Sequence, residues 1–269
     1  MSLKYIPTAA VALMVALPMA SHAAVLDGVG TFEGVAGVGT PNGDVTAPPN
    51  GDSSFVYVTT AGSTYMDAGL GLGGETNGSE VTTDAFSADA GDGLEYFFNY
   101  VTSDGTNSFV EYSYAFLNNL DAGTSNLIFT ARTNPNGDAV PGFDLPSIDP
   151  GVTLTPSSTP IIDDLTNWDV LGSSSGACFG GSGNGCGQTG WIQSNFTIAD
   201  AGNYSFTFGV INWGDTSLQS ALAVAGLTVG GDVIIGDPTT PPAVPLPAAG
   251  WLLVAGLGGL GVMRRRQKA

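Results

Sequence analysis

The side chains that most enzymes use for acid–base and nucleophilic chemistry are nearly missing from the middle of this chain. All 24 carboxylates lie between Asp27 and Asp237, where Arg132 is the only basic residue. The only histidine, His22, lies outside this region. A Ser–His–Asp triad and its lysine variants therefore cannot form there. We predict that the protein is not an enzyme, because general acid–base catalysis relies mostly on the missing residue types.

Carboxylates are the remaining side chains that could act as acid–base catalysts in this region. A pair of Asp or Glu side chains is enough for glycoside hydrolysis, so a carboxylate-only hydrolase is kept as the least favoured alternative. Asp163 and Asp164 form the only adjacent acidic pair, and a solvated turn beside Pro160 explains them more simply. The strong negative charge also excludes nucleic acid as a partner, since phosphate contacts need Lys and Arg.

Two turns carry the hard oxygen ligands that Ca²⁺ prefers. One contains Asp89 and Asp92, and the other contains Asn134, Asn136 and Asp138. Neither has the ligand spacing of an EF-hand loop. Asx-turn chemistry, in which the side chain caps its own backbone, accounts for both turns. We therefore expect no cofactor, and one structural Ca²⁺ stays open as the alternative.

Tryptophans next to turns raise the question of glycan binding. Trp168 and Trp191 flank turns, and aromatic faces on a β-sheet can hold sugar rings because apolar area and polar groups lie close together. Large aromatic side chains are more often buried, and Trp213, between two strand-like runs, suits a structural role. Trp168 and Trp191 are therefore weak candidates for a carbohydrate site.

Residues 1–23 have the three parts of a secretory signal peptide. Lys4 supplies the positive start, residues 6–20 are apolar, and residues 21–23 form a small-residue cleavage site. An ordinary membrane-spanning helix would need a longer apolar run. We expect cleavage after Ala23 and export of the chain that follows.

Cys178 and Cys186 are the only cysteines, eight residues apart with glycines between them. An exported chain meets an oxidising compartment, where disulfides persist. A zinc site would need two more soft ligands, and a catalytic thiol would need a histidine. We predict one disulfide, which stabilises the fold by about 2–3 kcal/mol.

The C-terminus has three parts in a fixed order. The first is a proline motif, made of Val244, Pro245, Leu246, Pro247 and Ala248. An apolar run follows at 249–263, about 22 Å long as a helix, against a membrane core of about 30 Å. The basic residues Arg264, Arg265 and Arg266 come next and are expected to stay in the cytoplasm. Residues 236–243 form a Pro/Thr linker in front of this tail.

This tail resembles the VPLPA variant of the PEP-CTERM sorting signal. The resemblance covers the last 26 residues and rests on the motif, the length and the basic end. It implies a Gram-negative cell in which an exosortase, a membrane enzyme, recognises the proline motif and cleaves near it. The precursor would be anchored in the inner membrane for a time, and the product would move to the cell surface or extracellular matrix. A plain C-terminal anchor helix is the alternative.

Between the two ends, short apolar runs alternate with turn residues. The runs lie at 55–58, 94–101, 109–117, 127–131, 191–198, 204–211 and 221–229. Their period of two and their β-branched and aromatic residues are typical of strands. The pattern predicts an all-β fold: one antiparallel β-sandwich of jelly-roll type over residues 24–235. Residues 135–190 are expected to form long Gly/Ser/Pro-rich loops over it, and a signal helix and a hydrophobic helix are expected at the two ends.

The later half of the domain resembles exported PEP-CTERM proteins whose domains are labelled choice-of-anchor. The residues that carry this resemblance lie at 98–105, 168–171, 176–178, 185–187, 190–191, 208–215 and 220–222. Gln219 departs from the pattern, because that family has an Asp at this position. The resemblance implies an exported β-sandwich and carries no activity with it.

These observations favour a non-catalytic protein of the cell envelope or extracellular matrix. Its expected partner is an exosortase-like processing enzyme, with the inner membrane as a transient location. A carbohydrate-binding module acting on exopolysaccharide is the alternative, and the carboxylate-only hydrolase comes last.

Overall fold

The computed structural model describes residues 28–133, 138–157, 159–163, 165–181 and 185–237. This part of the chain is all-β, and its strand pairings are antiparallel. Its one helical element is the short 3₁₀ helix η1 (Asp169–Ser174). The predicted all-β class is therefore confirmed.

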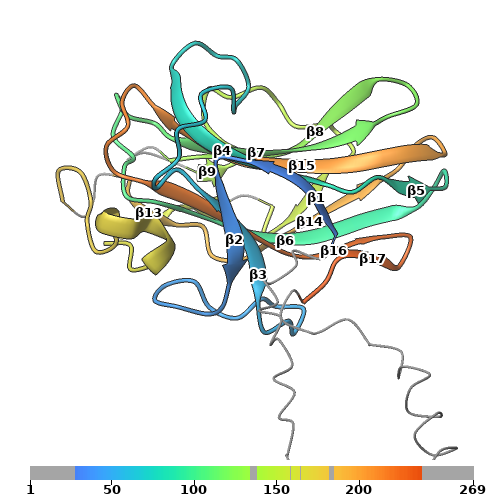
Figure 1. Ribbon diagram of the computed structural model, residues 1–269, viewed down its shortest axis with the longest axis horizontal. Helices are drawn as coiled ribbons and strands as arrows, with labels where there is room; N and C mark the ends of the chain where they lie inside the picture. Colours follow the sequence, from blue (N-terminus) through green and yellow to red (C-terminus); the bar gives the residue numbers. More distant parts are fainter. Residues whose placement is uncertain (1–27, 134–137, 158, 164, 182–184, 238–269) are drawn as a thin grey trace, which may run out of the picture.

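Two sheets within the described residues pack face to face (Figure 1). The first, sheet A, has the order β1 (Val29–Glu33), β4 (Glu75–Thr83), β15 (Gly202–Trp213), β7 (Tyr112–Asn119) and β8 (Thr124–Arg132), with β5 (Phe86–Ala88) paired to β15. The second, sheet B, has the order β10 (Thr153–Thr155), β14 (Ile192–Thr197), β6 (Gly93–Thr102), β16 (Ser220–Val229), β3 (Phe55–Thr59) and β2 (Val35–Gly39). The short strands β12 (Ile162–Asp163), β13 (Gly187–Gln188) and β17 (Asp232–Ile235) extend sheet B, and β9 (Asp138–Val140) pairs with β11 (Thr159–Pro160).

The main core lies between the two sheets. Alternation along β6 turns Tyr96, Phe98 and Tyr100 into this space, since successive strand residues point to opposite faces. Phe98 meets Phe129 of sheet A with ring centroids 3.8 Å apart, and Tyr96 meets Phe206 at 4.8 Å. These aromatic contacts join the two layers of a β-sandwich.

Each sheet also carries a smaller apolar cluster. Beside sheet B, Trp168 and Leu171 pack with Phe55 and with the alanines of β16 that point away from the main core. Beside sheet A, Tyr112 and Tyr114 pack with Ala68, Ile211 and Leu145. Apolar burial therefore holds η1, its flanks and the loops that contain Ala68 and Leu145 to the sandwich. Such burial stabilises a fold by about 25 cal/mol for each Å² of apolar surface removed from water.

Several elements differ from the expectation. β4 was not expected, because its sequence ETNGSEVTT lacks a run of apolar residues. β7 begins at Tyr112 instead of Phe109. The segment 135–190 holds short strands and η1 where long loops are predicted. These short elements gain their hydrogen bonds from distant segments, as when Gly187 of β13 pairs with Thr102.

The two ends of the chain lie outside the described residues. This applies to the predicted signal peptide with its cleavage site after Ala23, and to the sorting motif at 244–248 with the basic end at 264–266. Among the residues that are described, no helix is long and apolar enough to cross a membrane.

Candidate functional site

The sandwich has two polar regions, and β6 connects them. Thr102 ends β6 beside the disulfide, and Gly93 begins it beside a surface groove. These two residues are about 30 Å apart along the strand. We call the first region the polar end and the second the groove.

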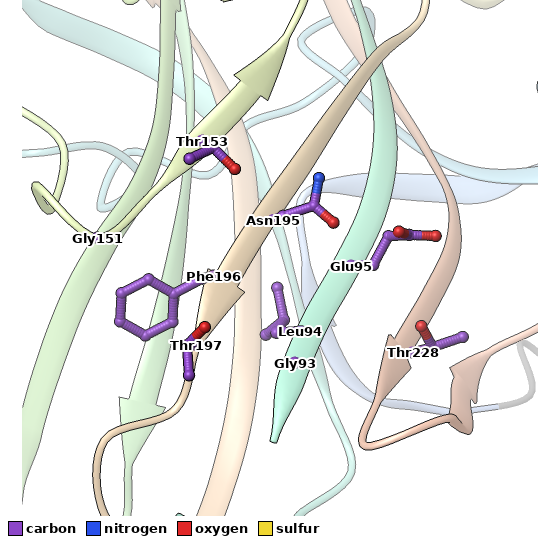
Figure 2. Close-up of a pocket in the computed structure, with 9 residues that line it drawn as sticks. All are labelled: Gly93, Leu94, Glu95, Gly151, Thr153, Asn195, Phe196, Thr197 and Thr228. Carbon is purple, nitrogen blue, oxygen red and sulfur yellow. The ribbon is translucent and has the colours of Figure 1, made fainter. Parts of the chain in front are cut away.

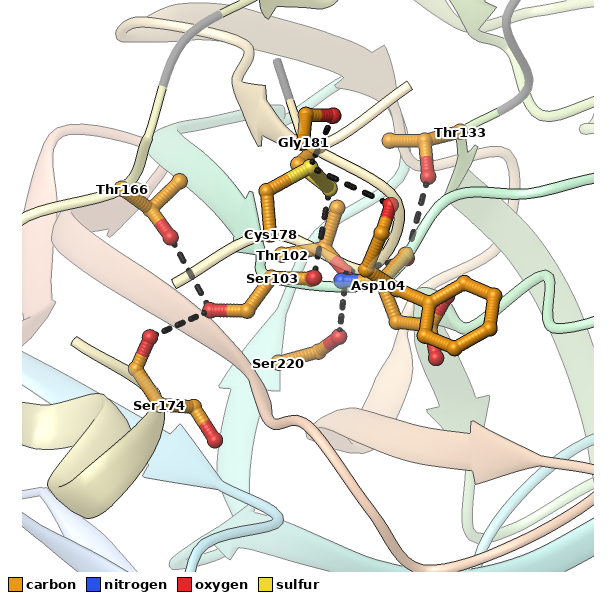
Figure 3. The surroundings of a disulfide bond; sticks show 11 residues. Thr102, Ser103, Asp104, Thr133, Thr166, Ser174, Cys178, Gly181 and Ser220 are labelled. Atoms are coloured by element: carbon orange, nitrogen blue, oxygen red, sulfur yellow. Dashed lines mark hydrogen bonds between the residues drawn. A yellow bond between two sulfur atoms is a disulfide. The ribbon is translucent and has the colours of Figure 1, made fainter. Parts of the chain in front are cut away.

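The predicted disulfide is present at the polar end. Cys178 and Cys186 are bonded, and Cys186 is buried. Cys186 Sγ lies 3.2 Å from the carbonyl oxygen of Ser103, and the same carbonyl accepts a hydrogen bond from the Phe179 N–H at 3.2 Å. Figure 3 shows this loop over Ser103 and Asp104. The disulfide loop is thus fastened to the segment that directly follows β6.

Hydroxyl groups line the interior at this end in place of apolar side chains. Ser220 Oγ donates to Thr102 Oγ1 at 2.7 Å across the β6–β16 pair. On the opposite face of sheet B, beside η1, Ser103 Oγ also reaches Thr166 Oγ1 and the Ser174 carbonyl, each at 3.0 Å (Figure 3). Between the same two sheets, the core therefore changes along its length from aromatic to polar.

Two carboxylic acids are buried at the polar end. Asp104 is 2% exposed and Glu111 is 0% exposed. Burial raises the pKa of Asp104 to about 7, while the N–H groups of Thr106 and Gly105 act in the opposite direction. Burial and the charge of Asp104 raise the pKa of Glu111 well above its ordinary value. Both effects arise because a low dielectric disfavours the charged form.

Arg132, the domain's one basic residue, packs against the outer cluster of sheet A, on the face that points away from the main core. Its guanidinium carbon lies 4.5 Å from the Trp213 ring centroid and 5.5 Å from that of Tyr112, both members of the outer cluster. Arg132 Nε donates to the Val110 carbonyl at 2.9 Å, and Nη1 donates to the Phe143 carbonyl at 3.4 Å. Carbonyl oxygens and ring faces are thus the groups that hold this cation in place.

A chain of amides runs next to the two acids. Asn212 Nδ2 donates to Asn77 Oδ1 at 3.1 Å and to Gln219 Oε1 at 3.4 Å. The Trp213 N–H donates to Glu111 Oε2 at 3.1 Å. Gln219 therefore serves here as a hydrogen-bond acceptor and carries no charge.

The sequence analysis did not select Asp104 or Glu111 as site residues. The segments at 98–105 and 208–215, which the sequence analysis singled out for other reasons, contribute Asp104 and the Trp213 N–H that binds Glu111. Their convergence depends on β6 of sheet B facing the paired strands β7 and β15 of sheet A, and the linear spacing does not contain this arrangement.

Of the Ca²⁺ candidates chosen from sequence, Asp89 and Asp92 form a turn that caps itself. Asp92 Oδ2 accepts the Asp89 N–H at 2.8 Å, and the Asp92 N–H donates back to the Asp89 carbonyl at 3.1 Å, as in a self-capped turn. Asn134 and Asn136 lie outside the described residues, and Asp138 begins β9. In the part of the chain that the structure describes, no three His, Cys, Asp or Glu side chains gather to hold a metal ion.

The tryptophans chosen from sequence pack against other side chains. Trp168 is 1% exposed and makes edge contacts with Phe55 and Tyr57 at centroid distances of 6.0 and 6.2 Å. Trp191 is half-buried, and its indole N–H donates to the Thr46 carbonyl at 3.0 Å. Trp168 therefore has no free ring face to offer a sugar.

The groove at the other end has a regular arrangement of polar side chains. Thr228, Glu95, Asn195 and Thr153 are cross-strand neighbours on four consecutive strands of sheet B, as Figure 2 shows. They line a cavity of about 440 Å³. Phe196 lines this cavity and a second one of about 370 Å³. A row of polar groups with an aromatic ring beside it can contact an extended polar ligand.

Comparison of the chain with protein-family models, curated proteins and solved structures finds no match.

Proposed function

We propose that this chain is a non-catalytic protein of the cell envelope or extracellular matrix. The observation that carries the proposal is the Cys178–Cys186 disulfide, because such bonds persist in oxidising compartments. The VPLPA-type tail supplies the route, with an exosortase-like enzyme as processing partner and the inner membrane as a transient anchor. The buried position of Asp104 and Glu111 argues against hydrolysis, since neither acid is accessible to a bulky substrate.

The sandwich in this proposal is of jelly-roll type. The chain passes repeatedly from one sheet to the other, as between β3 and β4 and between β14, β15 and β16. Strands distant in sequence become neighbours, as β4 and β15 do. Such crossovers are typical of two-sheet Greek-key and jelly-roll folds.

The tail gives the first prediction. Protein recovered from the surface of its host should end near Pro247, so its intact mass should lack the segment with Arg264–Arg266. Replacing both Pro245 and Pro247 with alanine should leave the full-length chain in the membrane fraction. Replacing Pro241 and Pro242, which lie outside the motif, serves as the control and should leave processing unchanged. A full-length surface protein would contradict the sorting role and leave a plain anchor.

The groove favours a second candidate function, the binding of exopolysaccharide. Its polar row matches the repeated hydroxyls of a glycan, and Phe196 offers an apolar surface beside the row. We expect the protein to bind the host's purified exopolysaccharide in calorimetry. Asn195→Ala should weaken binding about tenfold, because one lost hydrogen bond is worth about 1–1.5 kcal/mol.

The control for this second prediction is Ser125→Ala on β8, which belongs to the other sheet. Its affinity should equal that of the parent protein. Equal affinity for Asn195→Ala and the parent would exclude the groove as the binding site, and no measurable binding by the parent would reject the function.

A further inference from the structure

Two carboxyl groups buried in one core need either a proton or a positive charge beside them, because an isolated buried charge is very costly. The region from Asp27 to Asp237 contains no Lys and no His. Arg132 donates to the carbonyls of Val110 and Phe143 and stacks outside sheet A. Arg132 is close enough for its charge to lower the pKa of Glu111, and its buried Nη2 has no partner in the described residues. Its hydrogen bonds nevertheless go to the two carbonyls, and within the described chain none joins it to Asp104 or Glu111.

Several buried oxygen atoms at the polar end have no hydrogen-bond partner in the described residues. They are Tyr100 Oη, Asp104 Oδ1, Glu111 Oε1, Ser113 Oγ and Asn212 Oδ1. Each of these five residues is at most 2% exposed. In a folded core such atoms are normally paired, so five together mark a place where a bound group would supply the missing interactions.

Strand register places these oxygens near one another. Ile211 pairs with Tyr112, and Val210 pairs with Ser113. One residue beyond the first pair, Asn212 lies across from Glu111, and the Trp213 N–H bond to Glu111 holds this alignment. Side chains opposite each other on adjacent strands have Cβ atoms about 5 Å apart. Asn212 is thus a fully buried side chain that faces Glu111, and its Oδ1 has no hydrogen-bond partner among the described residues.

The other members reach the same place from sheet B. Tyr112 pairs with Arg132, so the next residues, Glu111 and Thr133, lie across from each other. Thr133 Oγ1 donates to the Asp104 carbonyl at 3.5 Å, which brings the end of β6 to this place. Besides burial, the charge of Glu111 raises the pKa of Tyr100. Asn212 Nδ2 is engaged by Asn77 and Gln219, which leaves its Oδ1 as the free atom. The end of β6, the start of β7 and the end of β15 therefore contribute to a single set of oxygens.

The chemistry of this set is specific. Every free atom is a hard oxygen, and two of the five belong to carboxylates, which suits Ca²⁺ or a similar cation. Because no three acidic, His or Cys side chains gather in the described chain, neutral oxygens must complete the shell. Ca²⁺ accepts such irregular mixed shells, whereas Mg²⁺ demands a tight octahedron. We propose that the polar end of the sandwich interior binds one Ca²⁺ through Asp104, Glu111 and Asn212.

Thermal unfolding of the full chain tests this proposal. After treatment with EDTA, the protein is melted in NaCl, MgCl₂ or CaCl₂ at one ionic strength, which keeps general charge screening constant. Ca²⁺ at about 100 times its dissociation constant should raise Tm by roughly 5–10 °C. Mg²⁺ should raise it much less. Equal midpoints in Ca²⁺ and Mg²⁺ would overturn the proposal.

Variants locate the site. Glu111→Gln and Asp104→Asn keep the shape of each side chain and remove its charge, so both should lose the Ca²⁺-dependent shift. Asp92→Asn, in the self-capped turn, should keep the full shift. Loss of the shift in Asp92→Asn alone would move the site to that turn and reject the polar end.

A direct measurement covers the case in which a variant fails to fold. Elemental analysis of the parent protein dialysed against Ca²⁺ should find one Ca²⁺ per chain, and none would overturn the proposal. If Glu111→Gln is more stable than the parent in EDTA and the parent shows no Ca²⁺ shift, the buried acids carry protons and the site is rejected.

Discussion

Replacing Phe98 with alanine should lower the free energy of unfolding by about 3–5 kcal/mol. Phe98 is 0% exposed and lies at the centre of the main core, where it contacts Phe129 of the opposite sheet. The substitution removes the apolar contact and leaves a cavity that rigid strands on both sides cannot fill. Urea unfolding followed by tryptophan fluorescence measures the loss.

The neighbouring residue provides the matched control. Phe97 lies next to Phe98 on β6, points away from the main core and is half-buried. Phe97→Ala makes the same chemical change on the same strand, so it should cost no more than about 2 kcal/mol, in keeping with its smaller buried area. Equal losses for the two variants would show that Phe98 does not join the two sheets.

Removing the disulfide should have the second largest effect. The double variant Cys178→Ser, Cys186→Ser should lose about 2–3 kcal/mol, because the bond restricts the unfolded chain over a short loop. The loop packs on Ser103 through Cys186 and Phe179, so hydrogen exchange at the end of β6 should rise as well. Denaturant unfolding and exchange mass spectrometry give the two readouts.

The reduced parent protein is the control for this variant. It should unfold at the same urea concentration as the double serine variant, since both lack the same bond. Non-reducing mass mapping of the oxidised protein should find one intramolecular bridge. Two free thiols in protein exported to an oxidising compartment, or a variant as stable as the oxidised parent, would contradict the stabilising role.

The strands differ in how far their own residues predict them. β15 alternates apolar and polar residues over much of its length, while β6 and β16 are rich in apolar residues. The predicted ranges of all three agree with the structure to within a few residues. β4 has Asn77 and Ser79 on its inward face, because it borders the polar end. A strand whose buried face is polar shows no apolar period, so its pairing with β15 becomes visible only in three dimensions.

The sequence by itself determined the all-β class, the lack of His and Lys in the domain, and the pairing of its only two cysteines. These follow from composition, from local alternation and from simple counting, which need no tertiary information. Only the tertiary structure decided which acids are buried, where Trp168 lies, and which polar side chains form the groove. Glu111 and Asn212 lie opposite each other because long-range strand register joins two segments separated by about a hundred residues, and local sequence does not encode that register.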